Sequence, residues 1–381
     1  MIAKIYPAGH PDSEGKTARY FDIRKLTEGE CLRLMDVPER HIRTLVESPE
    51  LSKSAIYKLA GNSIVVSCLY HIFRQIYSPQ RDANALPSLF PENQWRVRVP
   101  YPIRMVTLCS GYDSQLMAMD KLAGELMISD GTHPLVDLVA WSEFDPESKK
   151  PIQNQPAVVA HNLLFPEFKD RNLGDMTKID WEREVATRPE AYKDLDVLTY
   201  STPCQSVSQA GKRTGIKRGS GTRSAVLWYT EEAIRVLRPK FLLQENVKAL
   251  CNKVNMPDFQ EWQDVCAKLG YDNYWTVLNA KDFGVPQNRE RVFMLSVRRD
   301  LNLPPYEFPK PFPLTSAVAD VLQEDAAESY FLRPEGVIKF LQAQEGDNDG
   351  CLYEITDHFL SNEEIAQIRM RHAHDHTNAQ K

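Results

Sequence analysis

The chain has 381 residues, 42% of them hydrophobic, enough for one large or two to three small domains with sizeable cores. No stretch approaches the roughly 20 uninterrupted apolar residues of a membrane span, and the first 30 residues lack the apolar run of a secretory signal, which favours a cytoplasmic protein. Its seven cysteines form no CxxC pair, which predicts free thiols in a reducing compartment rather than a disulfide framework or a metal site.

The formal net charge of -6 would by itself argue against a nucleic-acid partner. The charge is unevenly distributed, however. Residues 1–100 hold 14 basic and 11 acidic side chains, residues 101–299 hold 26 of each, and residues 300–381 hold 6 basic and 15 acidic. The acidity therefore belongs to the C-terminal fifth, and the remaining chain can carry a local basic groove.

The N-terminal segment, residues 1–77, has the pattern of helices. Thr27 followed by Glu30 predicts a capping box at the start of a short helix. A second helix is predicted from about Ile64 to Tyr77, where the apolar residues share one stripe. Five prolines within residues 78–102 exclude a long helix there and predict an extended linker.

Residues 103–304 alternate short apolar runs with amphipathic stretches. The runs predicted as strands are Met105–Cys109, Val136–Trp141, Asp196–Tyr200, Phe241–Leu243, Tyr274–Leu278 and Arg291–Val297. The predicted helices include Gln115–Leu126, Ala225–Leu237 and Asp258–Leu269, the last ended by Gly270. This alternation predicts an α/β fold with a parallel, doubly wound sheet and a ligand at the carboxyl ends of its strands. Residues 305–381 form a small acidic region, with a capping-box pattern at Ser361 and Glu364.

A cysteine and a glutamate follow two of the predicted strands. Cys204 lies on the loop after Asp196–Tyr200, where a nucleophile belongs, and Pro203 fixes the backbone before it. Glu245 ends the next strand in the same crevice, where desolvation would let it hold a proton and act as an acid. Taken singly, each has a plainer explanation, an inert thiol on a turn and a cap or surface ion-pair residue.

Two arginines lead into the last predicted strand. Arg289 and Arg291 alternate along an extended segment and therefore point the same way, which suits a carbonyl oxygen or a phosphate. Without the other motifs, they would be an ordinary charged start of a strand. The interpretation of all three motifs depends on their occurring together.

Jointly, these motifs resemble the signature of the DNA cytosine-5 methyltransferase family. Pro203-Cys204-Gln205, Glu245-Asn246-Val247 and Gln287-x-Arg289-x-Arg291 occur in the family's order, and residues 279–286 match its lead-in. The resemblance extends from about Ile103 to Leu332. It implies a Rossmann-like methyltransferase fold that uses S-adenosylmethionine to methylate C5 of cytosine in DNA. It also implies four catalytic residues, which are Cys204, Glu245, Arg289 and Arg291.

The resemblance implies a mechanism on a flipped-out base. Cys204 adds to C6 of cytosine, Glu245 hydrogen-bonds or protonates N3, and Arg291, helped by Arg289, contacts the C2 carbonyl or orients the thiol and Glu245. C5 then takes the methyl group, and loss of the C5 proton with elimination of Cys204 releases the product.

The resemblance also assigns the residues that bind the cofactor. The loop from Leu108 to Ser114 corresponds to the family's phenylalanine-x-glycine-x-glycine loop, but Cys109 stands where an aromatic is usual and Asp113 and Ser114 replace two glycines. Glu143 matches the acid that bonds the ribose hydroxyls, and Asp175 matches the residue that reads the adenine amino group. The implied cofactor set is Leu108, Ser110, Gly111, Tyr112, Asp113, Ser114, Glu143, Asp175, Pro203, Asn62 and Ile64.

Two further family motifs stand at an unusual place. Arg24–Met35 resembles the ninth motif and Tyr57–Val66 the tenth, and both normally close the chain. The order therefore predicts a circular permutation whose break lies inside or beside the target-recognition region. The linker at 78–102 would join the old terminus to the first strand, a change that costs little when the termini lie close.

A basic loop follows the proposed nucleophile. Residues 209–223 contain five basic side chains, four glycines and no acid, which favours contact with phosphates over a merely solvated loop. The residues assigned to the DNA substrate are Gln205, Ser208, Lys212, Arg213, Lys217, Arg218, Arg223, Asn246 and Gln287.

Target recognition is the open question of the sequence. The recognition region would comprise residues after about 300 and residues 1–20, and most of this acidic segment is unsuited to reading DNA. We therefore expect that target recognition is minimal or is supplied by a second protein chain. Two alternatives stay open: the same chemistry on RNA, and a recognition or partner subunit without activity of its own.

Overall fold

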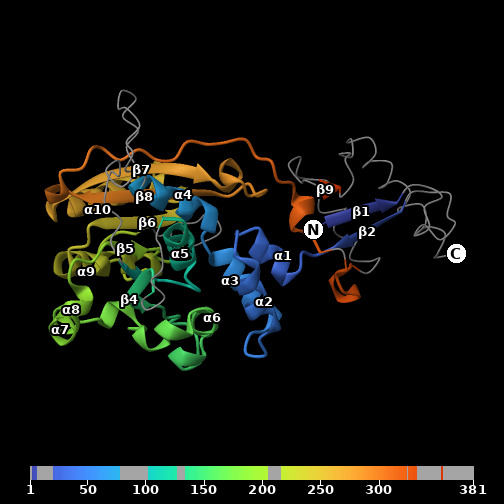
Figure 1. Ribbon diagram of the computed structural model, residues 1–381, viewed down its shortest axis with the longest axis horizontal. Helices are drawn as coiled ribbons and strands as arrows, with labels where there is room; N and C mark the ends of the chain where they lie inside the picture. The colour runs from blue at the N-terminus through green and yellow to red at the C-terminus, as the bar shows by residue number, and fades with distance from the viewer. Residues whose placement is uncertain are drawn as a thin grey trace. The chain divides into compact units, whose positions relative to one another are not determined.

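The computed structural model describes residues 2–6, 20–77, 102–126, 134–204, 216–323, 325–332 and 353–354, with the backbone alone for 2–6, 20–23 and 353–354 (Figure 1). The chain divides into two compact units, Leu32–Ser316 and Met1–Cys31 with Ala317–Lys381. These boundaries differ from the predicted ones at residues 77, 102 and 304, because the first 31 residues group with the end of the chain. Almost all of the predicted linker and the capping box at Ser361 lie outside the described residues.

The helices and strands follow the predicted alternation. The α-helices are α1 (Glu28–Arg33), α2 (Glu39–Glu47), α3 (Lys53–Asn62), α4 (Val66–Tyr77), α5 (Ser114–Leu126), α6 (Pro156–Leu164), α7 (Trp181–Thr187), α8 (Pro189–Tyr192), α9 (Thr230–Leu237) and α10 (Met256–Lys268). The strands are β1 (Ile2–Tyr6), β2 (Tyr20–Arg24), β3 (Ile103–Leu108), β4 (Val136–Ser142), β5 (Val197–Tyr200), β6 (Phe241–Val247), β7 (Tyr271–Asn279), β8 (Glu290–Arg298) and β9 (Tyr353–Glu354). Short 3-10 helices cover Ile152–Asn154, Pro166–Arg171, Met176–Lys178, Arg223–Tyr229, Lys248–Cys251, Ala280–Phe283, Arg299–Leu301, Val318–Val321 and Glu328–Tyr330.

The larger unit is built on a six-stranded sheet with the order β4-β3-β5-β6-β8-β7. β4, β3, β5 and β6 are parallel, but β8 runs antiparallel to both β6 and β7, so the prediction of a wholly parallel sheet is wrong at this end. The chain reverses directly after β7 through Ala280–Phe283 and Gly284, whose φ of +83° favours glycine. As a result, β8 begins at the edge where β6 ends, with Arg291 paired to Val247.

Helices cover both faces of this sheet, which confirms the predicted doubly wound α/β fold. Buried residues of α7, α8, α9 and α10 pack with those of β3, β5, β6 and β8 in one cluster, which includes Trp181, Phe259 and Trp262. On the other face α4 packs along α5, and Tyr77 contacts Phe241 edge to face. Each large side chain buried in this way stabilises the fold by about 1.5–3 kcal/mol relative to exposure.

The predicted helix ends are partly correct. α10 is followed by Gly270 at a φ of +98°, as predicted. The helix predicted over Ala225–Leu237 is instead a 3-10 helix followed by α9, and it stops at Arg238 in the left-handed conformation. Among the described residues, no helix has the length and apolar character that crossing a bilayer requires.

The smaller unit contains a three-stranded sheet with the order β2-β1-β9. The prediction of helices from the N-terminus onwards is wrong for this part, because β1 and β2 pair antiparallel, and their sequences are rich in isoleucine and aromatic residues that favour extended chain. The capping box is confirmed. Thr27 N donates to Glu30 Oε2 at 2.7 Å, and Glu30 N donates to Thr27 Oγ1 at 3.2 Å.

Candidate active site

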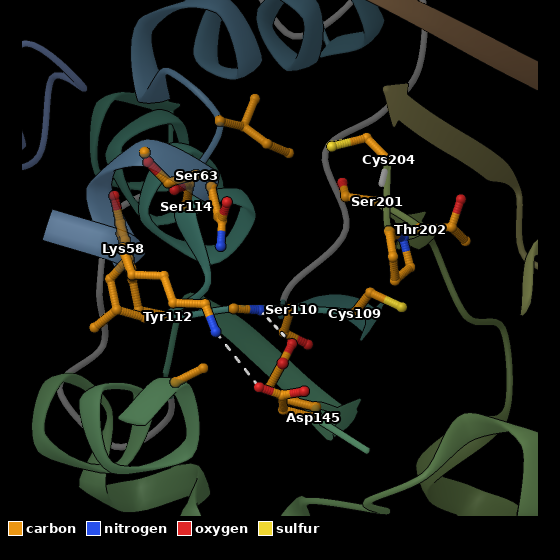
Figure 2. Close-up of a pocket in the computed structure, with 18 of the residues that line it drawn as sticks. Lys58, Ser63, Cys109, Ser110, Tyr112, Ser114, Asp145, Ser201, Thr202 and Cys204 are labelled. Atoms are coloured by element: carbon orange, nitrogen blue, oxygen red, sulfur yellow. Dashed lines mark hydrogen bonds and ion pairs between the residues drawn. The ribbon is translucent and has the colours of Figure 1, made fainter. Parts of the chain in front are cut away.

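A cleft with about 1340 Å³ of empty space opens at the carboxyl ends of β3, β4, β5 and β6 (Figure 2). The loop between α3 and α4 and the start of β8 complete its wall. Side chains from distant parts of the sequence meet here because parallel strands present their carboxyl ends at one edge. The predicted site residues that line the cleft are Asn62, Ile64, Ser110, Gly111, Tyr112, Ser114, Glu143, Pro203, Cys204, Arg223, Glu245, Asn246 and Arg291.

Cys204 lies on the loop after β5, on the opposite side of the pocket from Asp145 (Figure 2). The backbone before it is held by Asn246 Nδ2, which donates to Thr202 O at 3.1 Å, and by Ser224 Oγ, which donates to Pro203 O. Burial and the nearby Glu245 raise the pKa of the Cys204 thiol, while the arginines at 291 and 289 oppose that rise. The arginines therefore favour the thiolate that a nucleophilic attack requires.

Glu245 is only 8% exposed, and burial raises the pKa of its carboxyl against the opposing effect of Arg291 and Arg289. Arg291 Nε lies 3.2 Å from Glu245 Oε1, a contact that exists because β8 starts where β6 ends. A carboxyl group in this setting holds a proton more readily than an exposed glutamate, as predicted, and can donate it to a bound base.

Arg289 does not line the cleft itself. Its Nη2 donates to Gly61 O at 2.9 Å and to Ser63 O at 2.7 Å, so it holds the loop that carries Asn62. Burial and the adjacent Arg291 lower the pKa of Arg289 to about 10, and its charge still acts on Glu245. The two arginines serve one site through different contacts.

The loop after β3 has an unusual backbone. Cys109, Gly111 and Asp113 have φ values of +52°, +59° and +67°, so the left-handed conformation recurs at every second residue. Gly111 N donates to Glu143 Oε2 at 2.8 Å, which links this loop to the end of β4. Leu108 is buried at the end of β3, and neither Leu108 nor Asp113 lines the cleft.

Glu143 lies between the main cleft and an adjoining cavity of about 670 Å³. Burial raises the pKa of its carboxyl to about 7, against the hydrogen bond from Gly111 N. The adjoining cavity has apolar and sulfur-bearing walls from Cys109, Phe144 and Met176, with Asp175 at its edge. A half-buried carboxylate that can accept from a diol, beside a cavity with apolar walls, fits the nucleoside part of S-adenosylmethionine.

Comparison with known proteins identifies the family of the chain. The model of the C-5 cytosine-specific DNA methylase family matches residues 139–377. The chain belongs to this family. The family predicted from the sequence is therefore confirmed, and with it S-adenosylmethionine as the methyl donor that this family uses.

The curated relatives are similar over part of their length. The chain is 41% identical over 164 residues to the type II methyltransferase M2.ScrFI of Lactococcus lactis subsp. cremoris, covering 43% of each chain. It is 36% identical over 201 residues to the orphan methyltransferase M.SssI of Spiroplasma monobiae, covering 51% of this chain and 49% of the relative. The chain thus spans about half the length of these relatives. Among solved structures, the S. pombe Dnmt2 methyltransferase matches with a TM-score of 0.45 and 18% identity, over 71% of this chain and 81% of that one.

Two of the arginines predicted to contact DNA pair with acidic side chains of the chain itself. Arg223 pairs with Asp145 and Glu147 at 3.0 Å each. Arg218 pairs with Glu231 and lies over the Trp228 ring. Among the other residues predicted to contact DNA, Gln287 is half-buried and Lys217 is exposed. The remaining four, Gln205, Ser208, Lys212 and Arg213, lie outside the described residues.

Three other side chains that line the cleft were not predicted from the sequence. Lys58 of α3 and Asp145 after β4 both line the cleft, and Lys58 Nζ lies 3.5 Å from Asp145 Oδ2 (Figure 2). Gln155, before α6, accepts from Asp145 N at 2.7 Å and lines the cleft as well. The only signal for Lys58 was its place in the tenth motif, between Tyr57 and Asn62.

Proposed function

We propose that this chain transfers a methyl group from S-adenosylmethionine to C5 of cytosine in DNA. The observation that carries the proposal is the convergence of Cys204, Glu245 and Arg291 on one cleft, which also contains a pocket suited to the methyl donor. A thiol, a carboxyl group and a guanidinium around one space match the C6, N3 and C2 carbonyl positions of a single cytosine ring. S-Adenosylmethionine supplies an electrophilic methyl group when bound.

Each side chain has a defined part in the proposed reaction. The Cys204 thiolate adds to C6 and breaks the aromaticity of the ring, while Glu245 protonates or hydrogen-bonds N3 and takes up the developing charge. Arg291 contacts the C2 carbonyl or orients Glu245, to which it is already paired. C5 then forms a bond to the methyl carbon as the bond from that carbon to the donor's sulfur breaks, and the donor leaves as the neutral thioether. Loss of the C5 proton to solvent water, expulsion of the thiolate and return of the N3 proton to Glu245 restore the aromatic ring and the starting side chains.

The proposed substrate is a cytosine turned out of a DNA duplex. C6 and N3 of a stacked, paired base are inaccessible to side chains at the base of a cleft, so the base must leave the helix. The basic residues around 209–223 supply phosphate contacts to the flanking strand. Asn246 holds the backbone before Cys204 and borders the same cleft.

The proposed order of motifs is circularly permuted. Support comes from α3 and α4, which lie early in the chain but form part of the cleft and of the sheet's cover. Ser67 Oγ donates to Phe283 O at 2.7 Å, Tyr306 OH donates to Ile72 O at 3.0 Å, and Asn62 lines the cleft. The grouping of Met1–Cys31 with Ala317–Lys381 further supports a break inside the recognition region.

Target choice in this proposal rests on the smaller unit or on a second protein chain. The unit pairs strands from both ends of the sequence, in the register Ile2 to Tyr353. Its C-terminal part is acidic, which limits its contact with phosphates. We expect a short target sequence, or none, when the chain acts alone. Sequencing of a methylated random DNA library measures this directly, and a long, strictly required target would contradict it.

Methyl incorporation from labelled S-adenosylmethionine into DNA and into RNA tests the proposal. The expected result is transfer to DNA cytosine by the wild-type chain and none by Cys204→Ser, whose hydroxyl is too weak a nucleophile. Cys251→Ser is the matched control, because that cysteine is also partly exposed but lies outside the cleft. Transfer to RNA alone would favour the RNA alternative, and full-rate transfer by Cys204→Ser would show the mechanism to be wrong.

A further inference from the structure

Asp113 stands where the family's cofactor loop has a glycine, and it keeps a glycine-like backbone. Its φ is +67°, a conformation that aspartate tolerates better than most residues. Its side chain is fully buried and does not line the cleft. Ser110, Tyr112 and Ser114 of the same loop do line it (Figure 2). The carboxylate therefore acts inside the loop rather than on a ligand.

The Asp113 carboxylate organises the loop from within. Oδ2 accepts from Thr107 Oγ1 at 2.7 Å, and Oδ1 accepts from Leu116 N at 3.0 Å, which caps the first turn of α5. Its backbone N donates to Ser110 O at 2.8 Å and closes the turn around Gly111. A glycine at 113 could adopt the same φ but could make neither side-chain hydrogen bond.

A buried histidine stands behind this carboxylate. His161 Nε2 of α6 lies 3.5 Å from Asp113 Oδ2, and both side chains are fully buried. The His161 ring stacks on Trp141 of β4, with centroids 3.6 Å apart and planes 13° apart. Within the described residues neither ring nitrogen of His161 makes a hydrogen bond of good geometry. The Asp113 carboxylate, 3.5 Å away, is the polar group that offsets the cost of burying the imidazole.

We propose that Asp113 and His161 are positioning residues for the methyl donor. Through them, three walls of the cofactor pocket are fixed to one another: the loop from Cys109 to Ser114, the end of β4 before Glu143, and α6, whose first residues Pro156 and Ala157 line the cleft. This inference rests on the proposed function only in taking the ligand to be S-adenosylmethionine. Without the pair, the glycine-poor loop would sample other backbone conformations and present its amides incorrectly.

Equilibrium binding of S-adenosylmethionine to the full-length chain tests this inference, with methyl transfer measured separately. Asp113→Gly restores the family's residue, and we expect its Kd to rise about tenfold while kcat at saturating donor stays within about twofold of wild type. His161→Phe keeps the stacking on Trp141 but removes both nitrogens, and we expect a similar rise. Asp113→Asn should retain most of the affinity, because its amide oxygen still accepts from Leu116 N.

Asp120→Asn is the matched control, because this carboxyl lies on α5, the helix that Asp113 caps, and is partly buried but does not line the cleft. A folded Asp113→Gly chain with a Kd within about twofold of wild type would overturn the proposal, since glycine geometry alone would then suffice. If Asp113→Gly does not fold, the Kd of His161→Phe decides in the same way. A wild-type chain that binds the donor but transfers no methyl group contradicts the proposed function instead and leaves this comparison standing.

Discussion

The catalytic edge (Cys204, Glu245 and Arg291) and the cofactor loop (Cys109–Ser114) lie in one cleft but obey different constraints. In the proposed reaction, the side-chain atoms of the catalytic edge bond to a base, protonate it or hydrogen-bond to it, so few substitutions would preserve the chemistry. The cofactor loop is mainly a backbone shape. Its left-handed positions carry Cys109 and Asp113 as well as Gly111, so this backbone does not require glycine at every such position.

This difference predicts two kinds of variant. Changes at the catalytic edge should lower kcat while donor affinity stays unchanged, because those groups act in the transition state. Changes at the cofactor loop and its supports should raise the Kd of S-adenosylmethionine while kcat at saturation is nearly unchanged. Variants that mix the two effects would show that the regions are coupled.

Glu245→Gln at the catalytic edge should have the largest effect. The amide keeps the shape and a hydrogen bond but cannot supply the proton that the raised pKa of Glu245 makes available. We expect kcat for methyl transfer to fall by about 100-fold or more, the usual range for loss of a general acid. Single-turnover transfer to cytosine-containing DNA measures this, alongside the Kd of the donor.

Glu290→Gln is the control for that variant. Glu290 begins β8, the strand that pairs with the β6 strand carrying Glu245, and its side chain pairs with Lys248 at 2.8 Å, but it is exposed and outside the cleft. Its kcat should match wild type. A Glu245→Gln chain with more than about a tenth of wild-type activity would show that protonation of N3 does not depend on this carboxyl.

Glu143→Gln tests the cofactor side. The pKa of Glu143 is about 7, and the ionised carboxylate is the better acceptor for two ribose hydroxyls. Donor affinity of the wild type should therefore be constant above pH 7 and fall as the pH drops below it, because the carboxyl takes up a proton. The variant should bind about tenfold more weakly at pH 8 and show little pH dependence. Calorimetric titration from pH 5.5 to 8.5 measures both, and equal pH profiles would contradict the assignment.

Much of the catalytic edge could be predicted from the sequence, whereas its supports could not. Cys204, Glu245 and Arg291 each follow or begin an apolar run, but they stand out only because their motifs occur together in the order of a known family. The antiparallel β8 and the contacts of Arg289 with Gly61 and Ser63 depend on pairing between segments far apart in the sequence, which no local pattern encodes. His161 was missed for the same reason, because a single histidine in an apolar helix gives no sign of its partner.

Arg289→Lys should have an intermediate effect on donor binding, because Arg289 acts on both the catalytic edge and the cofactor pocket. Lysine keeps the positive charge near Glu245 but cannot donate to both Gly61 O and Ser63 O in the same fork. We expect the Kd of the donor to rise about three- to tenfold through the loop that carries Asn62, with kcat within about threefold of wild type. Arg299→Lys is the control, since Arg299 forms its bonds at the far end of β8. A large loss of kcat with unchanged Kd would assign Arg289 to the catalytic edge instead.

Asp145→Asn should have the smallest effect on donor binding, and it tests whether residues beyond Glu143 contribute to the cofactor pocket. Asp145 pairs with Lys58 at 3.5 Å and with Arg223 at 3.0 Å, and so joins α3 to the start of the 3-10 helix Arg223–Tyr229 beside the cleft. These pairs are partly exposed and worth at most about 1 kcal/mol.

We therefore expect the Kd of S-adenosylmethionine to rise about two- to fivefold at low salt for Asp145→Asn, and the difference to shrink as salt screens the pairs. Glu147→Gln is a close control, because Glu147 also pairs with Arg223 but is largely exposed and does not line the cleft. If both variants weaken binding equally, the effect belongs to Arg223 rather than to the bridge through Asp145. If neither variant weakens binding at low salt, the contacts of Asp145 with Lys58 and Arg223 contribute nothing to donor affinity.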